Sequence, residues 1–224
     1  MASSLHLPAF HSPRTASFRF LTATTLLLLS LVSLPSAAND GNLTEEEASR
    51  LIDMMLASQK DFVAALESTP ASAWNWKPAP DRWSVAECAE HIVRTERALF
   101  DTAKRALAKP ADPEWREKTA GKADLITRVM PDRSGPGAQA PQEVRPTEDL
   151  SRVAVLAQFH QTRAELLELL QKENLPLHRH LEEHPFPIFG WLSAYEWTIY
   201  VPLHTIRHTK QILEVQGTDG FPRS

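Results

Sequence analysis

The sequence predicts an all-α protein that folds as a four-helix bundle. The 224-residue chain contains only seven glycines. Several long segments repeat apolar residues with the 3.6-residue period of a helix, and no run alternates apolar and polar residues as a half-buried strand does. Capping-box sequences mark three helix starts. A long second crossover lets the second and third helices run parallel, which gives an up-down-down-up arrangement.

The first predicted helix begins at Thr44, where Thr44-Glu-Glu-Glu47 has the form of a capping box, and it ends before Pro70. The second begins at Ser84, where another capping box runs to Glu87. The residues expected to face the core are Leu51, Met55, Phe62 and Leu66 in the first helix, and Val85, Cys88, Ile92 and Leu99 in the second. The connection between them holds tryptophans expected to plug one end of the bundle: Trp74, Trp76 and Trp83.

Prolines interrupt the helical pattern from residue 109 to residue 148, so this segment is the predicted crossover, with one short helical piece from Asp124 to Val129. The third long helix is expected to start after Pro146, with Thr147 as its N-cap and Glu148 and Asp149 in its first turn, and to reach about residue 173. Its expected core face is Val153, Leu156, Ala157, Ala164, Leu167 and Leu170.

The last predicted helix begins at a third capping box, Ser193-x-x-Glu196, and ends before Gly217. Pro202 lies inside it and is expected to bend the chain just before His204. Its expected inward positions are Trp197, Val201, His204, His208, Ile212 and Val215.

The first 38 residues have the layout of a cleavable secretory signal peptide. Arg14 and Arg19 precede an apolar run from Phe20 to Leu34, and Ser36 and Ala38 are the small residues that a signal peptidase requires. The run of about 15 residues is short of the roughly 20 that span a bilayer, so an uncleaved anchor is the less favoured alternative. The sequence therefore predicts an exported protein, periplasmic or extracellular, whose single domain is residues 39–224 and which has no stable membrane insertion after cleavage.

Charge and cysteine content exclude several classes of partner and scaffold. The net charge of −4 becomes about −6 without the two arginines of the signal segment, so no basic face for nucleic acid is expected. The single cysteine, Cys88, allows no internal disulfide. The expected partner is a small-molecule substrate of unknown identity, and a homodimer is left open because such bundles often pair through their helices.

Three histidines form the candidate metal site. His204 and His208 are four residues apart and project from one inward face of a helix, while His91 lies at the edge of the inward stripe of another. Three imidazoles in a bundle interior suit a divalent cation and leave coordination positions open to water. Zinc is the default ion, with nickel, manganese or iron as alternatives. The other interpretation is that each histidine is a core residue hydrogen-bonded to a neighbour.

The order of several motifs resembles the DinB-like superfamily of metal-binding four-helix bundles. They are Trp83-Ser-Val-Ala-Glu87 followed by His91, then His184-Pro-Phe-Pro-Ile-Phe-Gly190, Ser193-Ala-Tyr-Glu-Trp197 and His204-Thr-Ile-Arg-His208-Thr-Lys-Gln-Ile212. The resemblance implies that the metal-ligand triad of the family falls on His91, His204 and His208, with no ligand missing.

Other residues allow two interpretations each, and the second is favoured in every case. Cys88 is a thiolate ligand or a small apolar filler, and His160 is a further ligand or a core histidine on an inward stripe. The loop histidines His178, His180 and His184 are a metal cluster or a solvated group. The sequence does not identify catalytic residues, but it offers three candidates. Glu87 and Glu96 are general bases or solvent-facing acids. Arg207 is a guide for an anionic substrate or a surface salt-bridge partner.

The function expected from these features is that of an exported metal-dependent enzyme of hydrolase type. Two alternatives remain: a metal-binding or stress-related bundle without turnover, and a thiol-dependent transferase of the kind found among the relatives that the resemblance implies. Export disfavours the transferase, because millimolar thiol cofactors are a cytosolic resource. A fourth protein ligand at the metal would indicate a structural site, and an open position would indicate a catalytic one.

Overall fold

The computed structural model describes residues 40–135, 139–147 and 149–223, so the predicted signal peptide and Glu148 lie outside the described residues. The elements in chain order are α1 (Glu45–Glu67), η1 (Ala71–Ala73), α2 (Val85–Leu107), α3 (Trp115–Lys118), α4 (Lys122–Val129), η2 (Gln142–Val144), α5 (Arg152–Leu170), β1 (Leu181–Glu183), β2 (Trp191–Ser193) and α6 (Ala194–Gln216). Within the described ranges, no helix combines the length and apolar character that crossing a bilayer requires.

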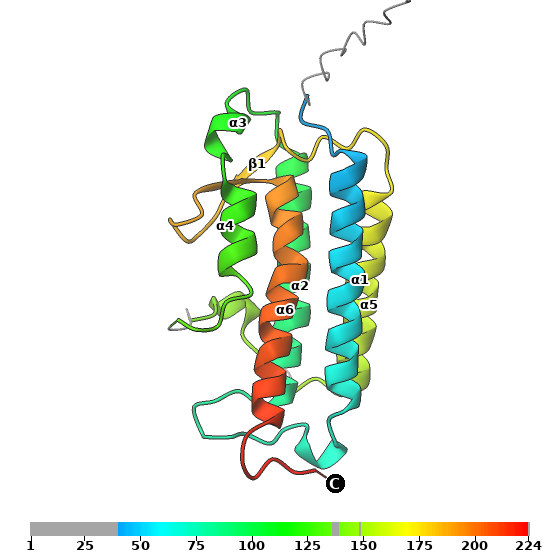
Figure 1. Cartoon of the computed structure of the whole chain (residues 1–224), viewed down its shortest axis with the longest axis vertical. Helices are drawn as coiled ribbons and strands as arrows, with labels where there is room; N and C mark the ends of the chain where they lie inside the picture. Colours follow the sequence, from blue (N-terminus) through cyan, green and yellow to red (C-terminus); the bar gives the residue numbers. More distant parts are fainter. Residues whose placement is uncertain (1–39, 136–138, 148, 224) are drawn as a thin grey trace, which may run out of the picture. The chain divides into compact units, whose positions relative to one another are not determined.

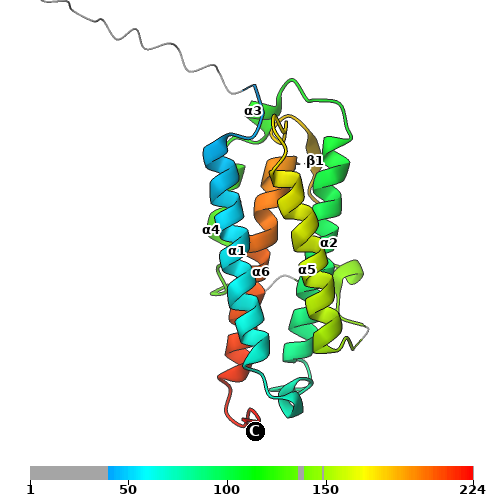
Figure 2. The same ribbon diagram turned by 90° about the vertical axis from the view of Figure 1, so that its right-hand side faces the viewer.

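Helices α1, α2, α5 and α6 form the predicted four-helix bundle (Figure 1). The chain runs down α1, up α2, up α5 and down α6, so α2 and α5 are parallel, as the long crossover predicts. The view turned by 90° shows α5 beside α1 and α2, with α6 behind it (Figure 2). Helix α4 of the crossover packs along the outside of α6.

The three predicted capping boxes are confirmed. Thr44, Ser84 and Ser193 each accept a hydrogen bond from the backbone N–H of the glutamate three residues later, at 3.2, 3.1 and 3.4 Å. Each glutamate carboxylate in turn accepts the backbone N–H of the cap residue, at 2.9, 2.8 and 2.8 Å. These reciprocal bonds satisfy N–H groups that a helix start leaves unpaired, and they fix where α1, α2 and α6 begin.

The predicted start of the third long helix is wrong. Helix α5 begins at Arg152, and its cap is Ser151, which accepts the N–H of Ala154 at 3.2 Å. Thr147 instead donates its backbone N–H to Glu90 of α2 at 2.7 Å, and Asp149 has a left-handed φ of 48°, which no helix tolerates. The helix ends at Leu170, short of residue 173.

The predicted core face of this helix is also wrong. Val153 is 78% exposed, and the residues buried on α5 are Val155, Phe159, Thr162, Arg163, Leu166 and Leu170. Only Leu170 belongs to both sets. The buried face carries Thr162 and Arg163, two polar residues that an apolar pattern places on the solvent side.

Most other elements agree with the sequence. The predicted core residues of α1, α2 and α6 are all buried, and the short crossover helix is α4. Helix α3 and the two three-residue strands were not predicted. The strands pair antiparallel with Leu181 opposite Ser193, and three residues are too few for an alternating pattern to stand out.

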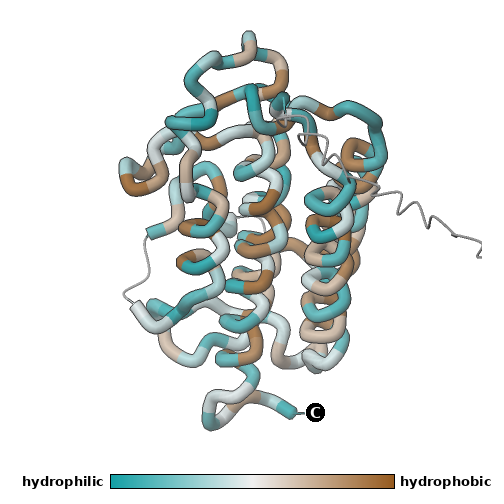
Figure 3. The backbone as a smooth tube through the Cα atoms, turned by 45° about the horizontal axis from the view of Figure 1, so that its top comes forward, coloured by the Kyte–Doolittle hydropathy of each residue, from teal (hydrophilic) through white to brown (hydrophobic). Residues whose placement is uncertain are grey.

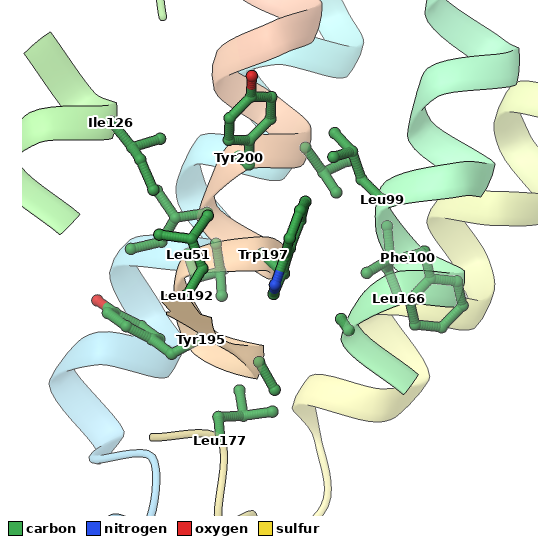
Figure 4. Packing of buried hydrophobic residues seen from close by; sticks show 14 of the residues in the cluster. Leu51, Leu99, Phe100, Ile126, Leu166, Leu177, Leu192, Tyr195, Trp197 and Tyr200 are labelled. Atoms are coloured by element: carbon green, nitrogen blue, oxygen red, sulfur yellow. The ribbon is translucent and has the colours of Figure 1, made fainter. Parts of the chain in front are cut away.

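The apolar core has two parts. One surrounds Trp197 and Tyr200 of α6, which lie among leucines of α1, α2 and α5 (Figure 4). The other lies towards the opposite end of the bundle and includes Phe62 and Phe159, whose rings are 4.7 Å apart. Apolar and polar segments alternate along each helix in the tube coloured by hydropathy (Figure 3). Trp74 and Trp76 pack against the second part, as expected of a plug.

Candidate metal centre

The structure brings the three predicted histidines together. His91 is on α2, and His204 and His208 are one turn apart on α6, which packs against α2. One ring nitrogen of each lies within 4.8 Å of the others, so a single point lies within about 2.8 Å of all three. The ring centroids are 4.9 Å apart for His91 and His204, 4.5 Å for His91 and His208, and 4.4 Å for His204 and His208.

Burial keeps the three imidazoles neutral. They are 3%, 6% and 9% exposed in chain order. Burial lowers the pKa of His91 to about 4, although the hydrogen bond to the Val144 carbonyl opposes the shift. Burial, followed by the neighbouring histidines, lowers the pKa of His204 and of His208 well below the usual value. Neutral imidazole is the form that coordinates a metal, because its lone pair is free.

Hydrogen bonds orient two of the rings. His91 Nδ1–H donates to the backbone carbonyl of Val144 at 2.7 Å, and His208 Nδ1–H donates to the side-chain oxygen of Gln211 at 2.8 Å. In both rings Nε2 is therefore left with its lone pair available, the arrangement usual for metal-ligating histidines.

His204 carries the observation that best fits a metal. Its Nδ1 is buried and has no hydrogen-bond partner in the described part of the chain. A buried polar atom without a partner costs free energy, and a metal ion bound to the imidazoles relieves that cost. The donor set is also the one that zinc and similar divalent cations prefer. The residues present therefore fit a divalent metal.

No fourth ligand from the described residues completes the cluster. Among the described histidines, cysteines, aspartates and glutamates, only His91, His204 and His208 form such a group. Cys88 is fully buried in the second part of the apolar core, where burial raises its pKa to about 12, so it is a thiol and an apolar filler. His160 is exposed and not on an inward face, which corrects its predicted place. The cluster leaves coordination positions open.

The two glutamate candidates are engaged in structural roles. Glu87 closes the capping box of α2 and binds Lys77 at 2.7 Å. Glu96 is fully buried and paired with Arg163 of α5, with Nη2 to Oε1 at 2.5 Å, so the expectation of a solvent-facing acid is wrong for Glu96. The sequence could not predict this pair, because its members are 67 residues apart.

Among the residues that the structure describes, Arg207 does not form the surface salt bridge that the sequence favoured. Its Nη1 donates to the backbone carbonyls of Asp132 and of Met130, the latter at 3.4 Å. These carbonyls directly follow α4, so Arg207 ties the end of α4 to α6. Lys210, one turn further along α6, donates to the carbonyl of Pro131 at 3.1 Å and reinforces the tie.

Among the described residues the loop histidines form no metal cluster. His178 and His184 are buried and His180 is partly exposed, so the favoured interpretation of a solvated group is wrong for the first two. His178 is 7% exposed and bonds to Glu47 at 3.2 Å, and His184 is 6% exposed and stacks on Trp197 with 4.9 Å between ring centroids. His180 donates through Nδ1 to the carbonyl of Lys109 at 2.7 Å. They hold the loop and the two strands onto the end of the bundle.

Aromatic rings flank the histidines. Trp83 lies 4.9 Å from His91 and 6.3 Å from His208 between ring centroids, so it covers the site, and like Trp74 and Trp76 it also packs against the second part of the core. Tyr200, one turn before His204, stacks on it with 6.3 Å between centroids and 19° between planes. No sequence pattern indicates Tyr200, Gln211 or Val144, because each acts through contacts that only the fold creates.

Comparison with known proteins places this site in context. The model of the DinB superfamily matches residues 54–212. The solved structure of YfiT from Bacillus subtilis, described as a probable metal-dependent hydrolase with an unusual four-helix bundle topology, is similar with a TM-score of 0.53. The two chains are 13% identical, and the match covers 80% of this chain and 91% of that one, which shows a shared fold. No curated protein sequence matches the chain.

Proposed function

The chain belongs to the DinB superfamily, and from that premise we propose that it is a metal-dependent enzyme of hydrolase type whose metal ligands are His91, His204 and His208. The observation that carries the proposal is the cluster of three neutral imidazoles without a fourth protein ligand among the described residues. A structural site is normally closed by four protein ligands, whereas a catalytic one keeps a position for water or substrate. The description of YfiT as a probable metal-dependent hydrolase supports the same reaction class.

The surrounding residues have identifiable tasks in this proposal. Val144 and Gln211 fix the orientation of His91 and His208 by accepting their Nδ1–H groups. Trp83 shields the site from bulk water on one side, because its ring packs against both of those histidines. When bound, a divalent cation supplies Lewis acidity, which lowers the pKa of water or polarises a substrate oxygen or sulfur. Zinc is the proposed ion, with nickel, manganese and iron as the alternatives that imidazole ligands accept.

Metal analysis of protein purified without a histidine tag tests the proposal. We expect about one equivalent of a divalent metal in the wild-type protein and its loss in His208→Ala. His184→Ala is the matched control, since His184 is an equally buried histidine outside the cluster, and it is expected to retain the metal. Equal metal content in all three proteins would refute the metal site.

A screen of the metal-loaded protein then distinguishes a hydrolase from a thiol transferase and from a bundle without turnover. Hydrolysis of model esters or amides that disappears with chelator and in His208→Ala supports the hydrolase proposal. Transfer of a low-molecular-weight thiol without hydrolysis would overturn it in favour of a transferase. Tight metal binding with neither activity would indicate a bundle that binds metal without turnover.

We also propose that the protein is exported. The support lies in the sequence alone, in the arginines, apolar run and small residues of segment 1–38. N-terminal sequencing of protein recovered from its native compartment is expected to begin at Asn39. A sequence that begins at or near Met1 would contradict cleavage.

A further inference from the structure

The candidate centre is poor in negative charge. Its three imidazoles are neutral ligands, and within the described ranges no carboxylate or thiol joins their cluster. A divalent cation held by them keeps both of its positive charges, and an uncompensated charge in a buried place is costly. An anion is therefore the ligand that this centre favours in its open position.

Arg207 adds a further positive charge beside the histidines. It lies three residues after His204 and directly before His208, and it is half-buried. Its Nη1 is held by backbone carbonyls, those of Met130 and Asp132. In the part of the chain that the structure describes, no carboxylate forms an ion pair with this guanidinium.

Asp132 and Glu214 are the acids that act on Arg207 through space, but neither forms an ion pair with it among the described residues. Glu214 is paired with Arg133 through two bonds of 2.8 and 2.7 Å. The exposed carboxylate of Asp132 accepts the backbone N–H of Ser134 at 2.8 Å. Glu214 therefore compensates Arg133 by direct contact, whereas no acid among the described residues contacts the guanidinium of Arg207.

Tyr200 and Trp83 complete the surroundings of the site. The Tyr200 side chain is 6% exposed, and its hydroxyl points away from the apolar cluster in Figure 4. Trp83 is partly exposed and presents an indole ring next to His91 and His208.

We propose that the histidine centre takes an anionic substrate, an oxyanion such as a carboxylate or phosphate group carried on an aromatic or apolar body, and that Arg207 is the residue that selects for its charge. The anionic group faces the metal and Arg207, and the apolar body packs against Trp83. This inference rests on the proposed metal-dependent function and names the substrate class of the same site.

Cobalt-loaded protein provides a readout that does not depend on turnover. The visible absorption of bound cobalt is followed while untagged protein is titrated with benzoate, phenyl phosphate or benzamide, the neutral isostere of benzoate. We expect at least one of the two anions to perturb the spectrum and to bind about tenfold more tightly than benzamide. Equal affinity for all three probes would overturn the proposal, and the tighter of the two anions identifies the preferred oxyanion.

Substitutions of Arg207 and Lys210 on α6 distinguish selection for the charge of the substrate from attachment of α4 to α6. Arg207→Gln is expected to weaken anion binding about tenfold, while Arg207→Lys retains most of it because the charge remains. Lys210→Gln is the matched control, since Lys210 also ties the end of α4 to α6, and it is expected to bind the anion normally. Equal weakening in Arg207→Gln and Lys210→Gln would assign the effect to attachment and overturn the role of Arg207.

Different results would refute the metal centre and the substrate class. Wild-type protein that takes up no cobalt would refute the metal centre itself. Cobalt that binds with a characteristic spectrum but shows no preference for anions would refute only the substrate class. Thermal melting of each variant, measured in parallel, separates loss of binding from loss of folding.

Discussion

Arg163 donates to both carboxylate oxygens of Glu96 in the middle of the bundle, from Nε to Oε2 at 3.0 Å and from Nη2 to Oε1 at 2.5 Å. The two side chains are 1% and 0% exposed. Arg163 also donates to the carbonyl of Met55 at 2.9 Å and to the hydroxyl of Thr205 at 3.2 Å. One polar network therefore joins α1, α2, α5 and α6, and Thr205 places it directly beside His204.

Breaking this buried pair is expected to destabilise the protein strongly. Arg163→Met leaves the Glu96 carboxylate buried without a cation, which costs about 3–5 kcal/mol of the free energy of unfolding. The double variant Glu96→Leu with Arg163→Met removes both charges and is expected to recover most of that loss. Urea denaturation measures each value, and a double variant no more stable than Arg163→Met would contradict the argument.

The exposed pair Arg97–Glu165 provides the matched control, because it joins the same two helices, α2 and α5. Its side chains are 33% and 38% exposed, and its shortest contact is 2.8 Å. Solvent screening limits such a pair to at most about 1 kcal/mol. Arg97→Met is therefore expected to cost much less than Arg163→Met.

The buried pair also explains where sequence reasoning succeeded and where it did not. Starts of helices are local, so the capping boxes at Thr44, Ser84 and Ser193 could be predicted from four residues each. The buried face of α5 could not be predicted in this way, since Arg163 is buried only because Glu96 of α2 pairs with it. A pattern that assigns every charged residue to solvent therefore predicts the wrong buried face for α5.

The candidate site likewise contains residues that a local pattern predicts and contacts that it does not. His204 and His208 share a face because of helix geometry alone, and His91 falls at the edge of the inward stripe of another helix, so the helical pattern already indicates all three. The groups that orient the rings are different in kind: the Val144 carbonyl comes from a crossover 53 residues away from His91. No local pattern predicts a contact of that sort.

The metal-free protein is expected to lose stability as the pH falls below 6.5. His91 has a pKa of about 4 in the folded protein and 6.5 as its ordinary value, so the unfolded chain takes up the proton first as the pH falls. The contribution of neutral His91 to the free energy of unfolding is complete above pH 6.5 and is lost towards pH 4. At pH 5 the loss amounts to about 2 kcal/mol. His204 and His208 shift in the same direction.

Denaturation in chelator at pH 7.5 and pH 5 measures this effect in the wild-type protein and in His91→Gln. The variant is expected to depend less on pH by about 2 kcal/mol over that interval. Glu47 and Glu214, whose pKa values are lowered, lose their contributions only below pH 4.5 and do not confuse the comparison. An identical pH dependence in both proteins would rule out His91 as a source.

Gln211 is expected to position His208 for metal binding. Gln211→Leu removes the acceptor of the His208 Nδ1–H group and is expected to weaken zinc binding about 10–100-fold, whereas Gln211→Glu retains an acceptor and retains affinity. Gln216→Leu is the control on the same helix, because Gln216 bonds to Ala65 and Thr69 far from the site. Competition with a zinc chelator gives the affinities, and unchanged binding in Gln211→Leu would remove this role.

Replacing His204 is expected to separate a metal ligand from a core histidine. If the cluster binds a divalent cation, His204→Ala lowers the stability of the metal-loaded protein by the lost binding term, about 2.7 kcal/mol when the metal is at 100 times its Kd. The metal-free forms should differ little, because the substitution also removes the buried, unpaired Nδ1. His184→Ala deletes an equally buried histidine that stacks on Trp197, so it should destabilise the protein equally with and without chelator. A His204→Ala protein that behaves like His184→Ala, and keeps its metal, would show that His204 is a packing residue.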